Sequence, residues 1–254
     1  MRRPLVMGNW KMNGRLESAK VLLAEVAAGA RELASVEIAV CPPFPFLNLG
    51  RTHSDISLGA QNVAAEAEGA YTGEVSAAML KDVGCRYVIV GHSERRTLFG
   101  ESNAVVARKF AQAQAQGLIP VLCVGETADE RNRSLTEEVI GGQIHAVVAA
   151  AGAAAFAGAV VAYEPMWAIG SGRAAAPEDA QAVHHFIRSL VARLSAEVAA
   201  GLRILYGGSV KAQNAPELFA QADIDGGLIG GAALNAREFA GICQAADKAA
   251  KKGS

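Results

Sequence analysis

The apolar residues of the chain are gathered into short runs, each followed by a turn of glycine, proline or polar residues and then by an alanine-rich stretch. Most of these runs are nearly continuous in Val, Ile and Leu, which is typical of strands that are buried on both faces. They predict eight buried strands: Pro4–Asn9, Val36–Cys41, Ile56–Ala60, Tyr87–Val90, Leu118–Val124, Val160–Tyr163, Arg203–Tyr206 and Gly227–Ile229.

The stretches between the runs have the spacing of helices. Apolar residues of Leu16–Ala30 recur at intervals of three and four residues, so they fall on one face of a helix. Thr127, with Glu130 three residues later, forms a capping-box pattern and predicts a helix that runs towards Ala150. A last helix is expected over Ala236–Lys248.

Strands that alternate with helices predict right-handed βαβ units and a parallel sheet, and hence an α/β fold. Eight units of about 30 residues account for the length of the chain and favour a closed (β/α)8 barrel of eight parallel strands, each followed by a helix. An open, doubly wound sheet is the alternative, but no G-x-G-x-x-G sequence follows the first strand. Because no linker or low-complexity tract divides the chain, residues 1–254 are expected to form a single domain.

Composition narrows the function classes. The chain has 24 Lys and Arg against 25 Asp and Glu, so its net charge of −1 gives no electrostatic basis for binding nucleic acid or an anionic membrane. The apolar runs are too short for a membrane span or a secretory signal, and we expect a cytoplasmic protein. The four cysteines are widely scattered and are expected to be buried, reduced thiols: Cys41, Cys85, Cys123 and Cys243.

Reactive residues and glycines follow five of the predicted strands. In a parallel barrel the carboxyl ends of the strands share one face, and that face carries the active site. Residues far apart in the sequence are therefore expected to converge there. They are Asn9 and Lys11 after the first strand, His92, Ser93 and Glu94 after the fourth, Glu164 and Pro165 at the sixth, Gly207, Gly208 and Ser209 after the seventh, and Gly230 and Gly231 after the eighth.

These side chains restrict the chemistry. A carboxylate (Glu164), an imidazole (His92) and an ammonium group (Lys11) suit proton abstraction next to a carbonyl, with stabilisation of the enediolate oxygen. A single carboxylate does not supply the acid and base pair of a glycosidase. In barrels the loops after the seventh and eighth strands commonly bind phosphate, and the backbone N–H groups of Gly230 and Gly231 suit that role.

Metal ligation is not indicated by the sequence. No H-E-x-x-H pattern or similar cluster occurs. His184 and His185 are neighbours on a predicted helix, so they point in different directions and cannot bind one ion together. We therefore expect neither a metal nor another cofactor.

Several longer motifs agree in order and spacing with one family. The chain resembles triosephosphate isomerase, which implies the TIM-barrel fold and the interconversion of dihydroxyacetone phosphate and glyceraldehyde 3-phosphate. The resemblance covers essentially the whole chain, and its motifs are Gly8–Lys11, Gly91–Arg96, Ala162–Pro165, Trp167–Gly170, Tyr206–Val210 and Gly230–Ala232.

The resemblance also implies roles for the site residues. Glu164 would move the proton between the two carbons, and His92 would polarise the carbonyl as a neutral imidazole. Lys11 would supply positive charge to the substrate, Asn9 a hydrogen bond, and Glu94 support for Lys11. The residues expected to bind the substrate and its phosphate are Asn9, Lys11, Gly170, Ser209, Gly230 and Gly231, with Ser93 in a supporting role.

Two segments are expected to act as a lid and as a dimer contact. The lid of the family would comprise Pro165, Met166, Trp167, Ala168, Ile169, Gly170, Ser171, Gly172, Arg173 and Ala174. The stretch Gln61–Glu74 has no clear strand or helix pattern, and long loops of this kind are often functional. Within it, the run Gly69–Glu74 resembles the dimer loop of the family, so Thr72, Gly73 and Glu74 would contact the neighbouring subunit of a homodimer.

Two other readings compete with the isomerase. Another metal-free barrel enzyme that acts on a sugar phosphate would use the same glycines, but a Schiff-base aldolase needs a lysine on the sixth strand, which offers Tyr163 and Glu164 instead. A non-catalytic relative would have lost Glu164, His92 or Lys11, and all three are present. The partners expected are therefore a triose phosphate and a second copy of the chain, and neither nucleic acid nor a membrane.

Overall fold

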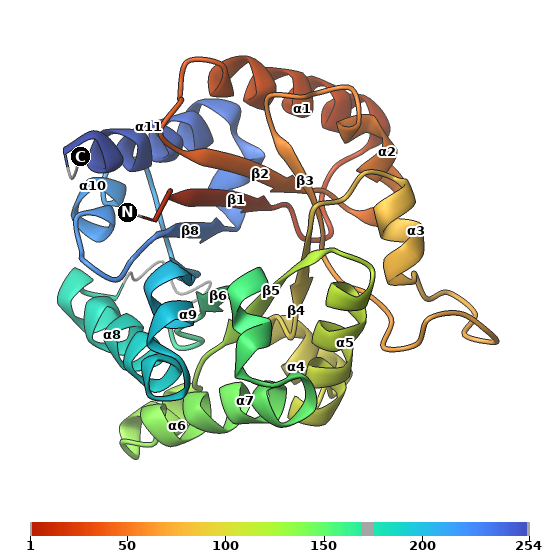
Figure 1. Cartoon of the computed structure of the whole chain (residues 1–254). Helices are drawn as coiled ribbons and strands as arrows, with labels where there is room; N and C mark the ends of the chain where they lie inside the picture. The colour runs from red at the N-terminus through yellow and green to blue at the C-terminus, as the bar shows by residue number, and fades with distance from the viewer. Residues whose placement is uncertain (1, 169–174, 253–254) are drawn as a thin grey trace.

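The computed structural model describes residues 2–168 and 175–252. Eight parallel strands form a closed barrel in which each strand pairs with the next and β8 pairs with β1, with helices around the outside (Figure 1). This confirms the (β/α)8 barrel. The strands end where the sequence predicts and begin within one residue of the prediction: β1 Leu5–Asn9, β2 Glu37–Cys41, β3 Ser57–Ala60, β4 Tyr87–Val90, β5 Ile119–Val124, β6 Val160–Tyr163, β7 Arg203–Tyr206 and β8 Gly226–Ile229.

The connections between strands are mostly helical. The α-helices are α1 Leu16–Ala30, α2 Leu47–Gly50, α3 Ala77–Asp82, α4 Ser93–Phe99, α5 Asn103–Ala115, α6 Ala128–Asn132, α7 Thr136–Ala151, α8 Pro177–Leu194, α9 Ala196–Gly201, α10 Ala215–Phe219 and α11 Ala236–Lys252. Short 3-10 helices are η1 Phe44–Phe46, η2 Ala153–Gly158 and η3 Gly231–Leu234. None of the helices in the described parts of the chain is long and apolar enough to cross a membrane.

One predicted helix is wrong in extent. The capping box of Thr127 and Glu130 is present, but the helix that it starts, α6, ends at Asn132. Ser134 then has a left-handed φ of 59°, which interrupts the helical backbone before α7 begins at Thr136. At the other end of the chain, α11 runs four residues beyond the predicted Lys248, and the Asn235 side chain accepts a hydrogen bond from the N–H of Glu238.

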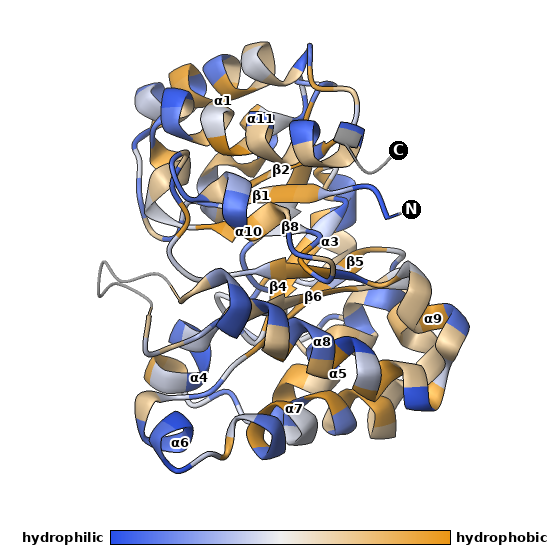
Figure 2. Ribbon diagram, turned by 90° about the vertical axis from the view of Figure 1, so that its left-hand side faces the viewer, coloured by the Kyte–Doolittle hydropathy of each residue, from blue (hydrophilic) through white to orange (hydrophobic). Residues whose placement is uncertain are grey.

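The core has two layers because successive strand residues point to opposite faces. Leu5 and Met7 belong to a cluster made of strand residues, which fills the barrel interior. Val6, between them, belongs to the larger cluster that joins the strands to the helices. Figure 2 shows the apolar strands in the centre and the polar faces of the helices outside. All four cysteines are buried and free, as predicted.

The amino-terminal end of the barrel is filled by charged side chains that satisfy one another. Arg203 Nη1 lies 2.7 Å from Glu37 Oε2, and the Tyr87 hydroxyl donates to Glu37 Oε1 at 2.7 Å. Arg203 Nη2 also donates to the Tyr87 hydroxyl at 2.9 Å. Burial and the carboxylate of Glu37 raise the pKa of Tyr87 to about 12, although the charge of Arg203 acts in the opposite direction. These side chains fill the amino-terminal end of the barrel, and the reactive residues lie at the opposite end, at the carboxyl ends of the strands.

Candidate active site

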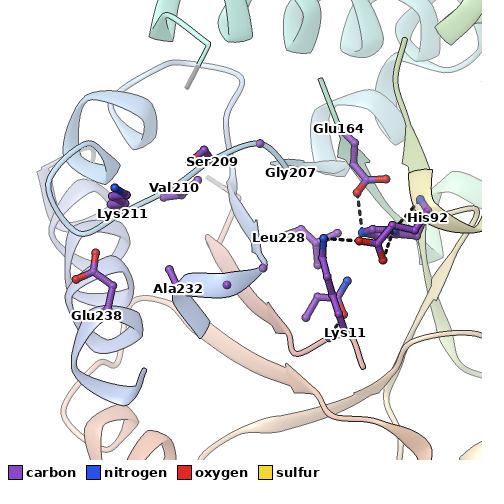
Figure 3. Close-up of a pocket in the computed structure, with 15 residues that line it drawn as sticks. Lys11, His92, Glu164, Gly207, Ser209, Val210, Lys211, Leu228, Ala232 and Glu238 are labelled. Atoms are coloured by element: carbon purple, nitrogen blue, oxygen red, sulfur yellow. Dashed lines mark hydrogen bonds and ion pairs between the residues drawn. The ribbon is translucent and has the colours of Figure 1, made fainter. Parts of the chain in front are cut away.

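A cavity of about 720 Å³ opens at the carboxyl ends of the strands (Figure 3). Most of its lining comes from the ends of β1 and β8 and from the segments that follow β1, β4, β6, β7 and β8, so residues more than 200 positions apart in the sequence meet there. The structure brings most of the predicted residues together, and the cavity is lined by Asn9, Lys11, His92, Glu94, Glu164, Ser209, Gly230 and Gly231. Ser93 and Pro165 do not line it. Gly207, Gly208, Val210, Lys211, Leu228, Ala232 and Glu238 complete it.

Glu164 lies at the end of β6 and is only 2% exposed. Its Oε1 is 2.9 Å from His92 Nε2, and its Oε2 accepts the backbone N–H of Ser93 at 2.8 Å. Ser93 is the first residue of α4, so the carboxylate faces the positive end of that helix. The Cys123 thiol contributes a further hydrogen bond. The contact of Ser93 with Glu164 is thus made by its backbone, and its supporting role stays a prediction.

These partners determine the charge of Glu164. Burial opposes a charge on the carboxylate, but His92, the Ser93 N–H and Cys123 lower the pKa of Glu164 below its ordinary value. Burial likewise opposes a charge on His92, and the carboxylate of Glu164 outweighs it and raises the pKa of His92. Glu164 is therefore held as a carboxylate in this arrangement.

The position of His92 at the start of α4 fixes which ring nitrogen carries a proton. His92 is the N-cap residue, and its Nδ1 accepts the backbone N–H of Glu94 at 3.2 Å. An acceptor Nδ1 carries no proton, so the proton of a neutral ring lies on Nε2, which faces Glu164. The ring is thus built to donate from Nε2 into the cavity.

Lys11 is held in a strained backbone conformation, with φ of 52°. Its N–H donates to Asn9 Oδ1 at 3.0 Å, and its carbonyl accepts from Gln61 Nε2 at 2.8 Å. Gln61 Nε2 also donates to the carbonyl of Cys41 at 2.8 Å, which ties the loop after β1 to the end of β2. The Lys11 ammonium group lies 2.6 Å from Glu94, so the predicted proximity of these two side chains is confirmed.

The other wall of the cavity is formed by the segments after β7 and β8 and lies across from Glu164 and His92 (Figure 3). At Gly207 a Cβ would lie 2.9 Å from Glu164 Cγ and 3.0 Å from the carbonyl oxygen of Tyr163, so a side chain there would collide with the segment that carries the carboxylate. Gly231 begins η3, and the first N–H groups of a helix have no partner inside it. Donors without intrahelical partners are thus available at this wall.

The lid predicted after Glu164 is described only in part. Residues 165–168 are described, whereas Ile169, Gly170, Ser171, Gly172, Arg173 and Ala174 lie outside the described residues, and so does the phosphate contact expected of Gly170. Trp167 Nε1 donates to Glu126 Oε1 at 3.0 Å, and Arg131 stacks over the indole at 4.4 Å. Beyond the lid, the Ala175 N–H donates to the Tyr206 hydroxyl at 3.1 Å.

The sequence prediction did not assign a role to Glu126 or Gln61. Glu126 is fully buried and accepts from both Trp167 and the Tyr163 hydroxyl, the latter at 3.1 Å. Glu126 lies two residues after the end of β5. The rule that polar residues at the ends of strands form the site would therefore have included it. Gln61 follows β3 in the same way. The same rule applied to all eight strands would thus have found both.

Two other predicted features have clear positions. The stretch Gln61–Glu74 contains no helix or strand, as predicted, and reaches out beyond α3 at the right of Figure 1. Its residues Thr72, Gly73 and Glu74 are exposed.

On α8, the buried His184 ring bonds through Nδ1 to the carbonyl of Asp223. Residues 2–168 and 175–252 contain no group of three or more side chains suited to a metal ion.

Comparison with known proteins agrees with this geometry. A sequence model described as triosephosphate isomerase matches residues 4–246. The triosephosphate isomerase of Thiobacillus denitrificans is 60% identical over 251 residues, covering 98% of this chain and 100% of that protein. That of Alcanivorax borkumensis is 57% identical over 249 residues, covering 97% and 99%. That of Dechloromonas aromatica is 56% identical over 250 residues, covering 97% and 100%. The chain belongs to the triosephosphate isomerase family.

Proposed function

We propose that this chain interconverts dihydroxyacetone phosphate and glyceraldehyde 3-phosphate by moving a proton between two adjacent carbons through an enediolate. The observation that carries the proposal is the arrangement of Glu164, His92 and Lys11 around one cavity. They supply a carboxylate base, a hydrogen-bond donor and a cation, which are the groups that this proton transfer needs.

Glu164 is the proposed base, and its resting contacts explain how its strength changes. In the resting arrangement, His92 and the Ser93 N–H keep its pKa low. When the carboxylate turns to a substrate carbon it gives up these contacts, while burial in the cavity still opposes its charge. Its pKa therefore rises at the moment when it has to accept a proton.

His92 is the proposed donor to the substrate oxygens. Once Glu164 turns away, the main cause that raised the pKa of His92 is removed, and burial together with the charge of Lys11 lowers this pKa against the remaining charge of Glu94. A neutral ring with its proton on Nε2 is then favoured, because Nδ1 still accepts the Glu94 N–H. Lys11 adds positive charge, Glu94 holds its side chain, and Asn9, whose Oδ1 binds the Lys11 N–H, offers its amide NH2 group to the substrate.

The phosphate group is assigned to the wall across from the base. Ser209, Gly230 and Gly231 line it, and Lys11 lies beside Gly230. Closure of the proposed lid, residues 165–174, would bring the Gly170 amide to the phosphate and exclude water. Water exclusion strengthens the local dipoles and protects the enediolate phosphate from eliminating its phosphate group.

Turnover of glyceraldehyde 3-phosphate tests this function. Dihydroxyacetone phosphate formed by the purified chain is measured by coupling to a reductase that consumes it. We expect rapid formation, unchanged by EDTA. Absence of turnover by the folded chain, or faster turnover of pentose phosphates, would instead favour a different sugar-phosphate enzyme.

Replacing Gly230 with Trp should raise KM for either triose phosphate by at least about ten-fold. A Cβ at this position would lie 3.5 Å from Lys11 Cε, so the indole would occupy the proposed phosphate site. Gly201→Trp is the matched control, because a Cβ there meets nothing within 4 Å and the residue is exposed. If KM stayed the same in the Gly230 variant, the phosphate would have to bind elsewhere.

We further propose a homodimer. Large apolar side chains are exposed in the segments that follow β1, β2 and β4 and in the loop Gln61–Glu74: Met12, Phe44, Tyr71, Leu98 and Phe99. Met12 is 95% exposed and lies one residue from Lys11. A second copy that covers this surface would bring its own Thr72, Gly73 and Glu74 to the loop that carries Asn9 and Lys11. The cytoplasmic location stays a prediction.

Sedimentation at micromolar protein should give about 52 kDa, which is twice the 26.2 kDa of one chain. Leu98→Glu, at a side chain that is 73% exposed, should shift the mass towards 26.2 kDa and reduce activity. Leu194→Glu on α8, where the side chain is 42% exposed, is the control and should leave the mass unchanged. A fully active monomer would refute the dimer.

A further inference from the structure

Arg96, on the second turn of α4, makes hydrogen bonds to three different segments. Its Nε donates to the carbonyl of Gly91 at 2.8 Å, and its Nη2 to the carbonyl of Cys123 at 3.2 Å. Its Nη1 donates to Asn103 Oδ1 at the start of α5 at 2.7 Å. One half-buried guanidinium group thus links the end of β4, the end of β5 and α5.

The two carbonyls belong to the segments that hold Glu164. Gly91 directly precedes His92 and Ser93, and Cys123 is the residue whose thiol bonds to the carboxylate. Gly91 has a φ of 68°, and a Cβ there would lie 2.9 Å from Arg96 Nη2, so the turn and the guanidinium group fit closely together. Arg96 therefore fixes both segments from which the resting partners of Glu164 come.

The guanidinium group also lies near Glu164, outside the lining of the substrate cavity. A small internal space is lined by Gly91, Ser93, Arg96, Cys123, Glu164 and Met166. Across this space the opposite charges of Arg96 and Glu164 attract one another. Burial nevertheless lowers the pKa of Arg96 below its ordinary value. The half-buried cation thus favours the ionised form of Glu164 in its resting position.

We propose that Arg96 is a positioning residue for the base, acting through the Gly91 and Cys123 carbonyls and through its positive charge near Glu164. It contacts none of the phosphate-binding wall, so it acts on the proton transfer and not on substrate affinity. The inference rests on the proposed isomerase function.

Arg96→Met and Arg96→Lys separate the two parts of this role. Methionine removes the hydrogen bonds and the charge, so we expect kcat to fall about ten-fold or more, with KM changed less than about two-fold. The groups that face Glu164 are His92, Cys123 and Arg96, with Lys11 and Glu94 acting on His92. Loss of the cation disfavours the ionised carboxylate and so raises the pKa of Glu164. The fall of kcat/KM at low pH, which is the acid limb of its pH profile, should therefore move to higher pH by about 0.5 to 1 unit.

Lysine keeps a positive charge, but its ammonium group lacks the planar, forked set of N–H donors with which arginine binds both carbonyls. We expect Arg96→Lys to lower kcat while its acid limb stays near that of the parent chain. If the methionine variant does not fold, the lysine variant decides, because parent-like kcat in a folded Arg96→Lys protein would overturn the positioning role.

Arg95→Met is the matched control on the same helix. Arg95 pairs with the buried carboxylate of Glu101, which keeps its ion pair with Lys109 at 2.6 Å after the change. This control should lower the thermal midpoint and leave the acid limb in place. An unmoved acid limb in Arg96→Met, or the same kinetic change in both variants, would overturn the inference. Inactivity of the parent chain would instead refute the proposed function.

Discussion

Replacing Glu164 with Gln is expected to lower kcat by about 10³-fold or more in both directions, within the range that general bases contribute. The amide keeps the size of the carboxylate, and its oxygen can still accept the Ser93 N–H, which lies 2.8 Å from Oε2 in the parent. It cannot accept a proton from carbon at neutral pH. KM should change much less than kcat, because the substrate contacts on the other wall are untouched.

Steady-state kinetics of the folded variant provide the measurement, with Glu238→Gln as the control. Glu238 lines the same cavity on the phosphate side, and its carboxylate accepts the Ala212 N–H at 2.7 Å. The control should keep kcat within about ten-fold of the parent. If the Gln variant turned over as fast as the control, Glu164 could not be the base.

Lys11→Met is expected to lower kcat/KM by about 10³-fold, comparable to the loss of a strong electrostatic donor. The ammonium group lines the cavity beside Glu94, and a Cβ at Gly230 would lie 3.5 Å from Lys11 Cε. Its removal leaves the substrate phosphate and the developing enediolate without that charge, and it also leaves Glu94 without its partner. Unlike Glu164→Gln, this change should raise KM and lower kcat together.

The matched control is Lys20→Met on α1, where Lys20 pairs with Glu17 at 2.8 Å on the surface. It has the same change in composition and charge, and its kinetics should match those of the parent. Comparison of both variants over a range of ionic strength checks that the effect is local. A loss below ten-fold in Lys11→Met would mean that another group neutralises the substrate.

The sequence predicted the strands well because a buried parallel strand needs apolar residues on both faces. It predicted the convergence of Asn9, His92 and Glu164 for a geometric reason, since all strands of a parallel barrel end on one face. The break at Ser134 was missed because an excellent capping box does not determine how far its helix continues. That end is set by one residue with a left-handed backbone.

The strand-end rule could have indicated Gln61 and Glu126, but the partners of the supporting residues could not be predicted in the same way. Gln61 holds the carbonyl of Lys11, Glu126 holds Trp167, and Arg96 joins Gly91 to Cys123. Each bond joins segments that are 27 to 50 residues apart except Arg96 to Gly91, and none leaves a spacing pattern. Such bonds depend on the register of neighbouring strands, which the apolar pattern does not specify to one residue.

The central claim is that Glu164 moves a proton between adjacent carbons of a triose phosphate. Its most direct test is ¹H NMR of dihydroxyacetone phosphate incubated to equilibrium in D₂O with the parent chain and with Glu164→Gln. We predict that the parent forms glyceraldehyde 3-phosphate and that solvent deuterium enters the carbons between which the proton moves, and that both are strongly reduced in the variant. Isomerisation without deuterium after prolonged cycling, or undiminished exchange in Glu164→Gln, would contradict the account.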